Sequence, residues 1–459
     1  MTDLLLAFYG DDFTGSTDAM DALARAGVET RLFLTPPDPA DVAALEGVDA
    51  VGVAGRTRSM SPSEMAAELE PAFERLAALD APLVHYKVCS TFDSAPEVGS
   101  IGRAVDVGAS AFDADTVPLL PGAPPLGRYV VFGTMFAAYD GDVYRLDRHP
   151  VMADHPVTPM DESDLRRHLS RQTDRELGLV DVRSLRERPD EALRAQAAAN
   201  DVVFFDSLRD ADLDAVGRLL WDELAGGGPA DDADADAPSF VVGSSGVEYA
   251  LTRRWDERGL ADATFDPLAP VEPVAVMSGS ASPATDTQIT RALDAGFRGV
   301  RIDTAALVDP DRAEGERRRV VTAATDALDA GESVVMFTSR GPDDPAIERT
   351  REAAAAAPTS RENVERFVGE AQGDLLAAVV ERTGPPRVCV AGGDTCGLVA
   401  PRLGIDALEV RYPLAPGVPL CRTVGVDRAP LVDEIALKGG QLGGPEYFVR
   451  LRDGDPATA

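Results

Sequence analysis

The amino-acid sequence predicts an α/β fold made of two α/β domains, each with a largely parallel sheet. Short apolar runs alternate with longer segments of helical period along most of the chain, which is the pattern of βα units. The chain has 459 residues, and a single hydrophobic core seldom organises more than about 300. A proline-rich stretch at residues 266–273 separates two series of βα units. We therefore expect domains at residues 1–265 and 272–455.

The strands of the first domain are predicted from short apolar runs with turn-forming or polar residues at their ends. They cover residues 4–9, 31–34, 48–53, 83–88, 129–132, 178–182, 202–205 and 240–242. Helices are predicted at residues 16–26, closed by Gly27, and at 62–78. The second helix has a clear start, because Ser61 and Glu64 have the spacing of a capping box, with Pro62 at the first helical position.

The second domain is predicted to begin after the prolines of residues 266–273, which block regular structure. Its strands are expected at residues 274–277, 299–302, 333–337, 387–390, 408–411 and 431–437. Its helices are expected at residues 285–295, 312–330 and 363–382. The Gly-, Asp- and Ala-rich segment 225–239 is interpreted as a solvated loop of the first domain.

The composition is strongly acidic, with a formal net charge of −34. A broad basic face for nucleic acid is therefore not expected, because phosphate neutralisation requires clustered Lys and Arg. Among the 44 basic residues, Lys87 and Lys438 are the only lysines. We interpret the acidic, lysine-poor composition as a salt-adapted, halophilic surface, whose self-repulsion is screened when salt is abundant.

The sequence lacks the signals of membrane insertion and export. No stretch approaches 18 continuous apolar residues, and no basic segment precedes the first apolar run. The four cysteines form no C-x-x-C pair, so neither a zinc ribbon nor a disulfide framework is indicated. We expect a cytoplasmic protein without a membrane partner. Assembly as a homodimer is left open.

Three candidate sites follow strands of the first domain, where ligands of open α/β sheets collect. Residues 10–16 place Asp11 and Asp12 between glycines, which predicts either a ligand site or a helix-capping turn. Because adjacent side chains diverge, one of the two carboxylates is expected to face the site. Residues 55–58 supply Arg56 and Arg58, and residues 87–94 begin with Lys87, a compact ammonium in a chain that otherwise uses Arg.

Glycine- and serine-rich turns follow strands of the second domain. Residues 391–395 contain two consecutive glycines between a buried strand and a short helix that Pro401 limits. Such a turn exposes backbone N–H groups that can hold phosphate, and Asp394 or Thr395 could reach a metal ion, although a plain strand-to-helix turn has the same sequence. Residues 278–282 and, in the first domain, 243–246 form comparable turns. Lys438 precedes another glycine pair.

Other enzyme classes and a metal site receive less support. No Walker-A sequence and no G-x-S-x-G elbow occur. His149 and His155 lie six residues apart on a loop, which is not a recognised ligand pattern, so no metal-ligating residues are assigned. A phosphatase or other hydrolase that uses Asp11 or Asp12 as nucleophile remains an alternative, as does a non-catalytic sugar-acid sensor.

The ordered set of segments resembles the four-carbon acid sugar kinase family, whose members phosphorylate threonate, erythronate or 3-oxo-tetronate with ATP. The similarity spans nearly the whole chain. It rests on residues 11–15, Arg58, residues 87–90, 243–246, 278–280, 392–395, 415–419 and 438–440. It implies an acid-sugar-binding first domain and a nucleotide-binding second domain, with their ligands facing each other across an interdomain cleft, and the use of Mg²⁺.

The resemblance also implies roles for individual residues. Asp12 and Lys87 would be catalytic. The acid sugar would be bound by Asp12, Arg56, Arg58, Lys87, Cys89 and Ser90. ATP would be bound by Ser278, Ser280, Gly392, Gly393, Asp394, Thr395, Gly439 and Gly440. One departure concerns the substrate, since better-known members are similar to K-x-D-S-T where this chain has Cys89. A related acid sugar, such as an oxidised apionate derivative, is then an alternative to threonate or erythronate.

Overall fold

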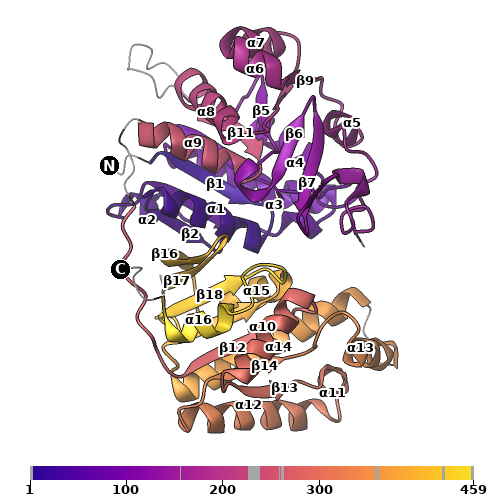
Figure 1. Ribbon diagram of the computed structural model, residues 1–459, viewed down its shortest axis with the longest axis vertical. Coiled ribbons are helices and arrows are strands. Elements are labelled where there is room, and N and C mark those ends of the chain that lie inside the picture. Colours follow the sequence, from indigo (N-terminus) through magenta and orange to yellow (C-terminus); the bar gives the residue numbers. More distant parts are fainter. Residues whose placement is uncertain are drawn as a thin grey trace. The chain divides into compact units, whose positions relative to one another are not determined.

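A computed structural model describes residues 4–155, 157–225, 238–257, 259, 263–356, 361–425 and 429–455 of the chain. It divides the chain into two compact units, Met1–Ala263 and Thr264–Ala459 (Figure 1). Both units are α/β, as the sequence predicts, and each contains parallel strands and helices. The predicted loop at residues 225–239 falls mainly on residues 226–237, which lie outside the described part.

The main sheet of the first unit is parallel throughout its described pairings. Its strand order is β2(Thr30–Phe33), β3(Ala50–Ala54), β1(Leu6–Gly10), β4(Leu83–Lys87), β11(Ser239–Gly243), β5(Val117–Leu120), β10(Val202–Phe205) and β9(Leu177–Val180). Because all strands run the same way, their carboxyl ends meet at one edge. The residues that follow β3, β1, β4 and β11 are therefore neighbours in space.

Helices cover this sheet in two groups. The helix α1(Phe13–Arg25) contacts α9(Gly246–Glu257), which packs on α8(Asp210–Arg218), and α3(Pro62–Ala77) packs on α4(Ile101–Ala111). The start of α3 is as predicted, because Ser61 and Glu64 form the capping box. Shorter helices are α2(Pro39–Ala43), α5(Leu165–Leu169), α6(Val182–Glu187) and α7(Pro189–Ala197).

A small antiparallel sheet differs from the sequence prediction. It contains β6(Arg128–Val131), β7(Thr134–Tyr139) and β8(Asp142–Arg145), so the strand expected at residues 129–132 lies outside the main sheet. The main sheet instead contains β5, which the prediction missed because Pro118 interrupts its apolar run. The β6–β7 turn is held by Asp206, whose carboxylate accepts from the N–H groups of Phe132 (2.6 Å) and Gly133 (2.9 Å).

The sheet of the second unit is parallel except at one side. The order is β13(Arg298–Arg301), β14(Val334–Phe337), β12(Val274–Ser278), β15(Arg387–Ala391), β18(Glu434–Lys438), β17(Val418–Val424) and β16(Ala407–Ala415). The pairings of β17 with β18 and with β16 are antiparallel. The helices are α10(Pro283–Asp294), α11(Thr304–Val308), α12(Ala313–Asp329), α13(Pro345–Ala356), α14(Arg361–Thr383), α15(Gly393–Val399) and α16(Tyr447–Asp453).

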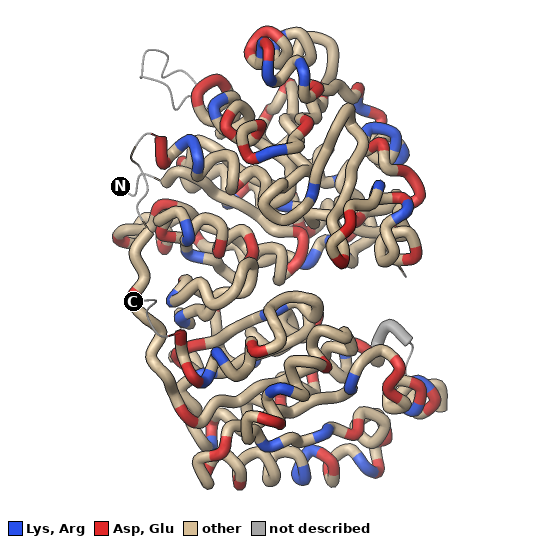
Figure 2. Tube along the Cα trace, in the orientation of Figure 1, with Lys and Arg blue, Asp and Glu red and all other residues tan. Residues whose placement is uncertain are grey.

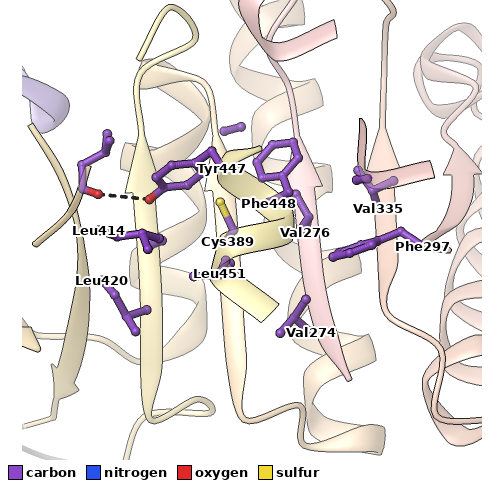
Figure 3. Packing of buried hydrophobic residues seen from close by; sticks show 14 of the residues in the cluster. Val274, Val276, Phe297, Val335, Cys389, Leu414, Leu420, Tyr447, Phe448 and Leu451 are labelled. Atoms are coloured by element: carbon purple, nitrogen blue, oxygen red, sulfur yellow. Dashed lines mark hydrogen bonds between the residues drawn. The ribbon is translucent and has the colours of Figure 1, made fainter. Parts of the chain in front are cut away.

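The core of the second unit packs α16 against the sheet (Figure 3). Val274 and Val276 alternate along β12 and belong to the same buried cluster as Phe448. The Tyr447 hydroxyl donates to the Val418 carbonyl at 3.1 Å, so the one polar group of this ring is satisfied inside the core. Burying each such large apolar side chain contributes about 1.5–3 kcal/mol to folding. This packing stabilises the sheet, and the second candidate site lies at the carboxyl ends of its strands.

Acidic and basic residues are interspersed along the outer helices, as Figure 2 shows for α12. Many of them form ion pairs within one helix, such as Glu316 with Arg319 at 2.6 Å. Among the described residues, no helix is long and apolar enough to cross a membrane.

Candidate active site

The first candidate site lies at the carboxyl edge of the first unit's sheet. Asp11 and Asp12 follow β1, Arg58 follows β3, and Lys87 ends β4, the strands on either side of β1. Backbone hydrogen bonds tie these turns together, because the Asp11 N–H donates to the Lys87 carbonyl (2.9 Å) and the Arg58 N–H donates to the Asp11 carbonyl (2.9 Å). The sheet order thus brings together residues that are far apart in the sequence.

Asp12 is the N-cap of α1 and is also held by a cation. Its carboxylate accepts from the Gly15 N–H (2.8 Å) and the Thr14 hydroxyl (2.9 Å), and from Nη1 and Nη2 of Arg58 (2.9 Å each). Burial alone would raise its pKa, but the charges of Arg58 and Lys87 and these hydrogen bonds outweigh burial and lower it. Both sequence interpretations, capping turn and charged site, therefore apply to Asp12.

Arg58 binds both carboxylates at once. Its Nε and Nη2 donate to Asp11 at 3.1 and 2.7 Å, while Nη1 and Nη2 donate to Asp12. A guanidinium can hold both aspartates because it presents two edges that bind carboxylates. The side chain of Asp11 is 4% exposed and that of Asp12 is 23% exposed, so Asp12 is the more accessible of the two. Burial raises the pKa of Asp11, although Arg58 acts in the opposite direction.

Lys87 lies beside this cluster, with Nζ 3.7 Å from Oδ2 of Asp18 on α1. Burial would lower the pKa of Lys87, but the charges of Asp18, Asp12 and Asp11 outweigh it and raise the pKa. The same Asp18 oxygen accepts from the Ser245 hydroxyl, and burial raises the pKa of Asp18. The sequence interpretation missed Asp18, which its position four residues after Thr14, on the same face of α1, could have suggested.

The remaining predicted substrate residues lie around the cluster. Cys89 donates its backbone N–H to Asp11 (3.3 Å), and its thiol contacts the Thr91 hydroxyl at 3.1 Å. Burial raises the pKa of the Cys89 thiol to about 11, so this side chain is neutral. Ser90 is partly buried beside it, whereas Arg56 is exposed.

The second candidate site is a cavity of about 800 Å³ in the second unit. One part of its lining is apolar and includes Ile347, Val364, Val368 and Leu398. The polar part of the lining includes Gly279, Thr338, Ser339, Gln372, Asp394 and Thr395, and Thr304, Glu348, Thr350, Arg351 and Glu365 also line the cavity. A cavity of this size, with both apolar and polar lining residues, can accommodate a nucleotide-sized ligand. The sequence interpretation missed Thr338 and Gln372, which only the fold brings next to Gly279.

The polar residues of this cavity are closely packed around glycines. A Cβ atom at Gly279 would collide with Oγ1 of Thr395 and lie 2.9 Å from Oε1 of Gln372. Gly392 has a φ of 123°, which strongly favours glycine. Within the described chain, the buried Ser278 hydroxyl and Gln372 Nε2 have no hydrogen-bond partner, and such orphaned polar atoms are typical of a ligand site.

The predicted nucleotide-binding residues divide into those that line the cavity and those near it. Asp394 and Thr395 are in the lining. Ser278, Ser280, Gly392, Gly393, Gly439 and Gly440 are not in it. Gly440 connects the turn after β18 to the start of α10, because its carbonyl accepts hydrogen bonds from the hydroxyls of Ser282 (2.5 Å) and Thr285 (2.7 Å).

Lys438 points into the core, where its Nζ donates to the Thr285 hydroxyl at 3.1 Å. Burial lowers its pKa to about 8.

A Mg²⁺ ion in a kinase is bound mainly by water, substrate phosphates and one or two carboxylates. Asp394 is exposed and lines the cavity, so it fits a site of that kind. The described residues contain no cluster of three or more His, Cys, Asp or Glu side chains able to hold a metal by themselves.

Comparison with known proteins gives matches over nearly the whole chain. Residues 6–251 match a sugar-binding N-terminal domain, and residues 275–448 match a nucleotide-binding C-terminal domain. The chain is 46% identical to 3-oxo-isoapionate kinase of Paraburkholderia graminis over 99% of its length and 96% of that enzyme. It is 34% identical to 3-oxo-tetronate kinase of Cupriavidus necator over 97% of its length and 95% of that enzyme.

Solved structures have the same fold. A Salmonella typhimurium protein described as a putative tRNA synthase superposes with a TM-score of 0.77 at 25% identity, covering 97% of this chain and 98% of its own. A Haemophilus influenzae protein gives a TM-score of 0.70 at 21% identity, covering 96% and 98%. Together with the two domain matches and the kinase relatives, these findings establish that the chain belongs to the four-carbon acid sugar kinase family.

Proposed function

We propose that this acid sugar kinase transfers a phosphoryl group from ATP to a hydroxyl of 3-oxo-isoapionate. The observation that carries the proposal is the 46% identity to 3-oxo-isoapionate kinase, against 34% or less to the matched 3-oxo-tetronate kinases. Apionate is a branched five-carbon sugar acid, so the proposed substrate is bulkier than a linear four-carbon one. The site must then accommodate an added branch.

Cys89 supports the choice of a branched substrate. Its thiol is neutral and smaller than a carboxylate, and it lies next to Asp11. The resembling motif has aspartate at this position, which would add a third negative charge beside Asp11 and Asp12. A thiol removes that repulsion and leaves room for a carbon branch, because it accepts hydrogen bonds only weakly and behaves as a small apolar group.

In this proposal Lys87 and Asp12 act on the reacting groups. Lys87 has a raised pKa and remains charged at neutral pH, so it can stabilise the oxygens of the transferred phosphoryl group. Asp12 orients the attacking hydroxyl in exchange for one of its present donors, such as Thr14. Its lowered pKa makes it a weak proton acceptor, and positioning dominates phosphoryl transfer.

The other predicted residues have supporting roles. Arg58 fixes Asp11 and Asp12, Ser90 adds a hydroxyl beside Cys89, and Arg56 lies at the exposed rim. In the second unit, the apolar lining of the cavity suits an adenine base, and the polar residues around Gly279 suit the phosphates. The turns that contain Gly392, Gly393, Gly439 and Gly440, with Ser278 and Ser280, support that polar end. Asp394 would hold Mg²⁺, which would supply neutralisation of the negative charge on the ATP phosphates.

A hydrolase that uses Asp11 or Asp12 as nucleophile is disfavoured by the geometry. Arg58 donates two hydrogen bonds to each carboxylate, which lowers their nucleophilicity and fixes their orientation. A sensor that only binds its ligands is not favoured, because the matched relatives are named as kinases.

The test is a coupled ADP-release assay with 3-oxo-isoapionate, 3-oxo-tetronate, threonate and erythronate, with the product identified by ³¹P NMR. We expect a new phosphomonoester and a kcat/KM for 3-oxo-isoapionate at least tenfold above that for 3-oxo-tetronate. Equal or reversed preference would reject the substrate assignment, and absence of turnover with every acid would reject the proposed activity. Cys89→Asp should lower the preference for the branched acid, whereas Cys421→Ser, a buried change in the second unit, should leave the preference unchanged.

A further inference from the structure

Several buried polar atoms in the first unit have no hydrogen-bond partner within the described chain, and three of them lie on residues of the segments that follow β4, β5 and β8. They are Oδ1 of Asp93, Nε of Arg128 and Nε2 of His149. Buried polar groups are nearly always paired, so each unpaired one requires an explanation. Two of these atoms are donors and one is an acceptor, which is a complementary set for a polar ligand.

Arg128 is held in place through one end of its guanidinium. Its Nη1 donates to the carbonyl oxygens of Leu126 (3.0 Å), Gly127 (3.4 Å) and Ala138 (3.3 Å) in and around the small antiparallel sheet. Nε remains without a partner. These contacts fix the orientation of the planar group, so its N–H on the other side is presented in one direction.

His149 is fixed in a defined tautomer. Its Nδ1 accepts from the N–H groups of Val151 and Met152, at 3.2 Å each. In the neutral ring, Nε2 must then carry the proton and act as a donor. The side chain is only 3% exposed, and its ring packs edge-on against Tyr139. Burial lowers the pKa of His149, so this neutral tautomer predominates at pH 7.

The three residues belong to one group of charges. Besides burial, the charge of Arg128 lowers the pKa of His149, and the charge of Asp93 raises it. Burial likewise lowers the pKa of Arg128, whereas the charge of Asp93 acts in the opposite direction. Arg128 and His149 both contact β7, because Nη1 of Arg128 donates to the Ala138 carbonyl at 3.3 Å and the His149 ring packs against Tyr139, the next residue. Asp93 lies in the loop after β4, four residues beyond Cys89.

The fold places this group at the same edge as Asp12 and Lys87. The segment that leads into β6 follows the carboxyl end of β5, and Arg128 exchanges backbone hydrogen bonds with Ala123 (2.9 and 3.1 Å). Farther along β6, Val130 exchanges backbone hydrogen bonds with Ser207, which follows β10. The small sheet is thus anchored at the carboxyl ends of two strands of the main sheet.

Charge balance separates this group from Arg58. The two charges of Asp11 and Asp12 already neutralise Arg58, and they would repel an incoming carboxylate. Lys87 is likewise paired, with Asp18. Among the residues that the structure describes, no carboxylate lies within hydrogen-bond distance of Arg128, and its Nε–H has no partner. The anionic group of an acid sugar is therefore better received by Arg128 than by Arg58.

We propose that Arg128 Nε and His149 Nε2 bind the carboxylate of the acid sugar, and that Asp93 Oδ1 accepts a hydrogen bond from a neighbouring hydroxyl. This inference rests on the proposed function for the class of substrate. It orients the substrate, because the carboxylate then lies toward the small sheet and the reacting hydroxyl toward Asp12 and Lys87. It also makes the small sheet the element that selects acids over uncharged sugars.

The experiment compares an acid with its uncharged analogue. Erythrulose is 3-oxo-tetronate with a hydroxymethyl group in place of the carboxylate. Arg128→Met should lower kcat/KM for 3-oxo-tetronate by about 100-fold, the range expected for losing charged hydrogen bonds, and change kcat/KM for erythrulose and the KM for ATP less than threefold. Arg128→Lys retains a donor, so it should lower kcat/KM for 3-oxo-tetronate less than Arg128→Met does. His149→Gln also retains a donor and should likewise cause only a partial loss. Arg145→Met removes an exposed arginine of the same sheet and should change nothing.

An equal loss for acid and uncharged sugar would overturn the inference, because it would indicate a structural role for Arg128. Calorimetric titration with 3-oxo-isoapionate in the absence of ATP separates this result from failure of the proposed function. If no acid is phosphorylated, the proposed activity fails, while carboxylate binding that Arg128→Met weakens at least tenfold would still support the inference. Undiminished binding in Arg128→Met would reject it.

Discussion

Replacing Arg58 with alanine should destabilise the first unit through the two carboxylates that the arginine holds. Arg58 donates two hydrogen bonds to Asp11 and two to Asp12, and the side chain of Asp11 is only 4% exposed. Without the guanidinium, two adjacent carboxylates remain with Lys87 as the nearest cation. Removing one partner of a buried ion pair costs about 3–5 kcal/mol. Since Arg58 is 25% exposed, we expect the lower end, about 3 kcal/mol.

The loss should depend on pH in a defined direction. The pKa of Asp12 is lowered in the folded protein, so its contribution to stability is present above its unfolded pKa and is lost as the pH falls through the lowered value. In Arg58→Ala the principal charge that opposes burial is gone, and both carboxyls then have raised pKa values. The folded variant binds protons that the unfolded chain releases, so its stability falls as the pH rises above about 4. The difference from wild type should therefore be larger at pH 8 than at pH 5.

Tryptophan fluorescence reports this unfolding specifically. The chain has two tryptophans, and Trp221 and Trp255 both lie in the first unit, with ring centroids 5.3 Å apart. Urea unfolding at pH 5 and pH 8 gives the free energy of unfolding for wild type and variant. Arg56→Ala is the matched control for stability, because this exposed arginine is two residues away and its removal should cost less than about 0.5 kcal/mol.

Two outcomes would refute the reasoning. A loss below about 1 kcal/mol at pH 8 would mean that the four hydrogen bonds of Arg58 contribute little net stability. A loss that is larger at pH 5 than at pH 8 would mean that repulsion between the carboxylates is not its source.

Three further predictions concern the second unit and the surface. Gly279→Ala should weaken ATP binding at least tenfold, because the added methyl collides with Thr395. Gly315→Ala, where a methyl meets open space, should leave ATP binding unchanged. Equal affinities of the two variants for ATP by calorimetry would exclude the cavity as the ATP site. The wild-type protein should gain about 2 kcal/mol of stability between pH 8 and pH 9.5, because the pKa of the buried Lys438 is about 8 and the unfolded chain binds the extra proton over this range. Lys438→Met should abolish this gain. Hydrogen exchange of β18 measures the stability, and an unchanged pH profile in the variant would contradict the prediction. The melting temperature should rise from 0.1 M to about 2 M KCl because of screening of the −34 net charge, and a fall would reject salt adaptation.

The sequence predicts the main sheets well because buried parallel strands are continuous apolar runs. The strand predicted at residues 202–205 is β10, and that predicted at 83–88 is β4 with one residue fewer. Strands whose sequence lacks that pattern were missed. Pro118 hides β5, and β7 and β8 are only half buried, so their polar residues obscure the alternation.

The sites are predicted only in part, because the sequence of a turn indicates candidate residues but not the residues that they contact in the fold. The sequence indicates Asp12, Arg58 and Lys87 because they follow apolar runs. It cannot indicate that Arg58 holds both aspartates, which depends on β3 lying next to β1. Gln372 lies in the middle of α14, where nothing local distinguishes it from other surface-type residues, and only the packing of α14 on α15 brings it to Gly279.

Each candidate site is formed by residues of one unit, and this has a consequence for specificity. The residues around Asp12, including Cys89 and Arg128, all belong to the first unit, and those lining the 800 Å³ cavity all belong to the second. A substitution at Cys89 or Arg128 can therefore change the acid that is bound without altering any residue of the cavity. Such independence would allow the acid-sugar site to differ between relatives named for 3-oxo-isoapionate and 3-oxo-tetronate without a change in the residues of the cavity. It requires that Arg128 variants retain their affinity for ATP, which the kinetic comparison above measures directly.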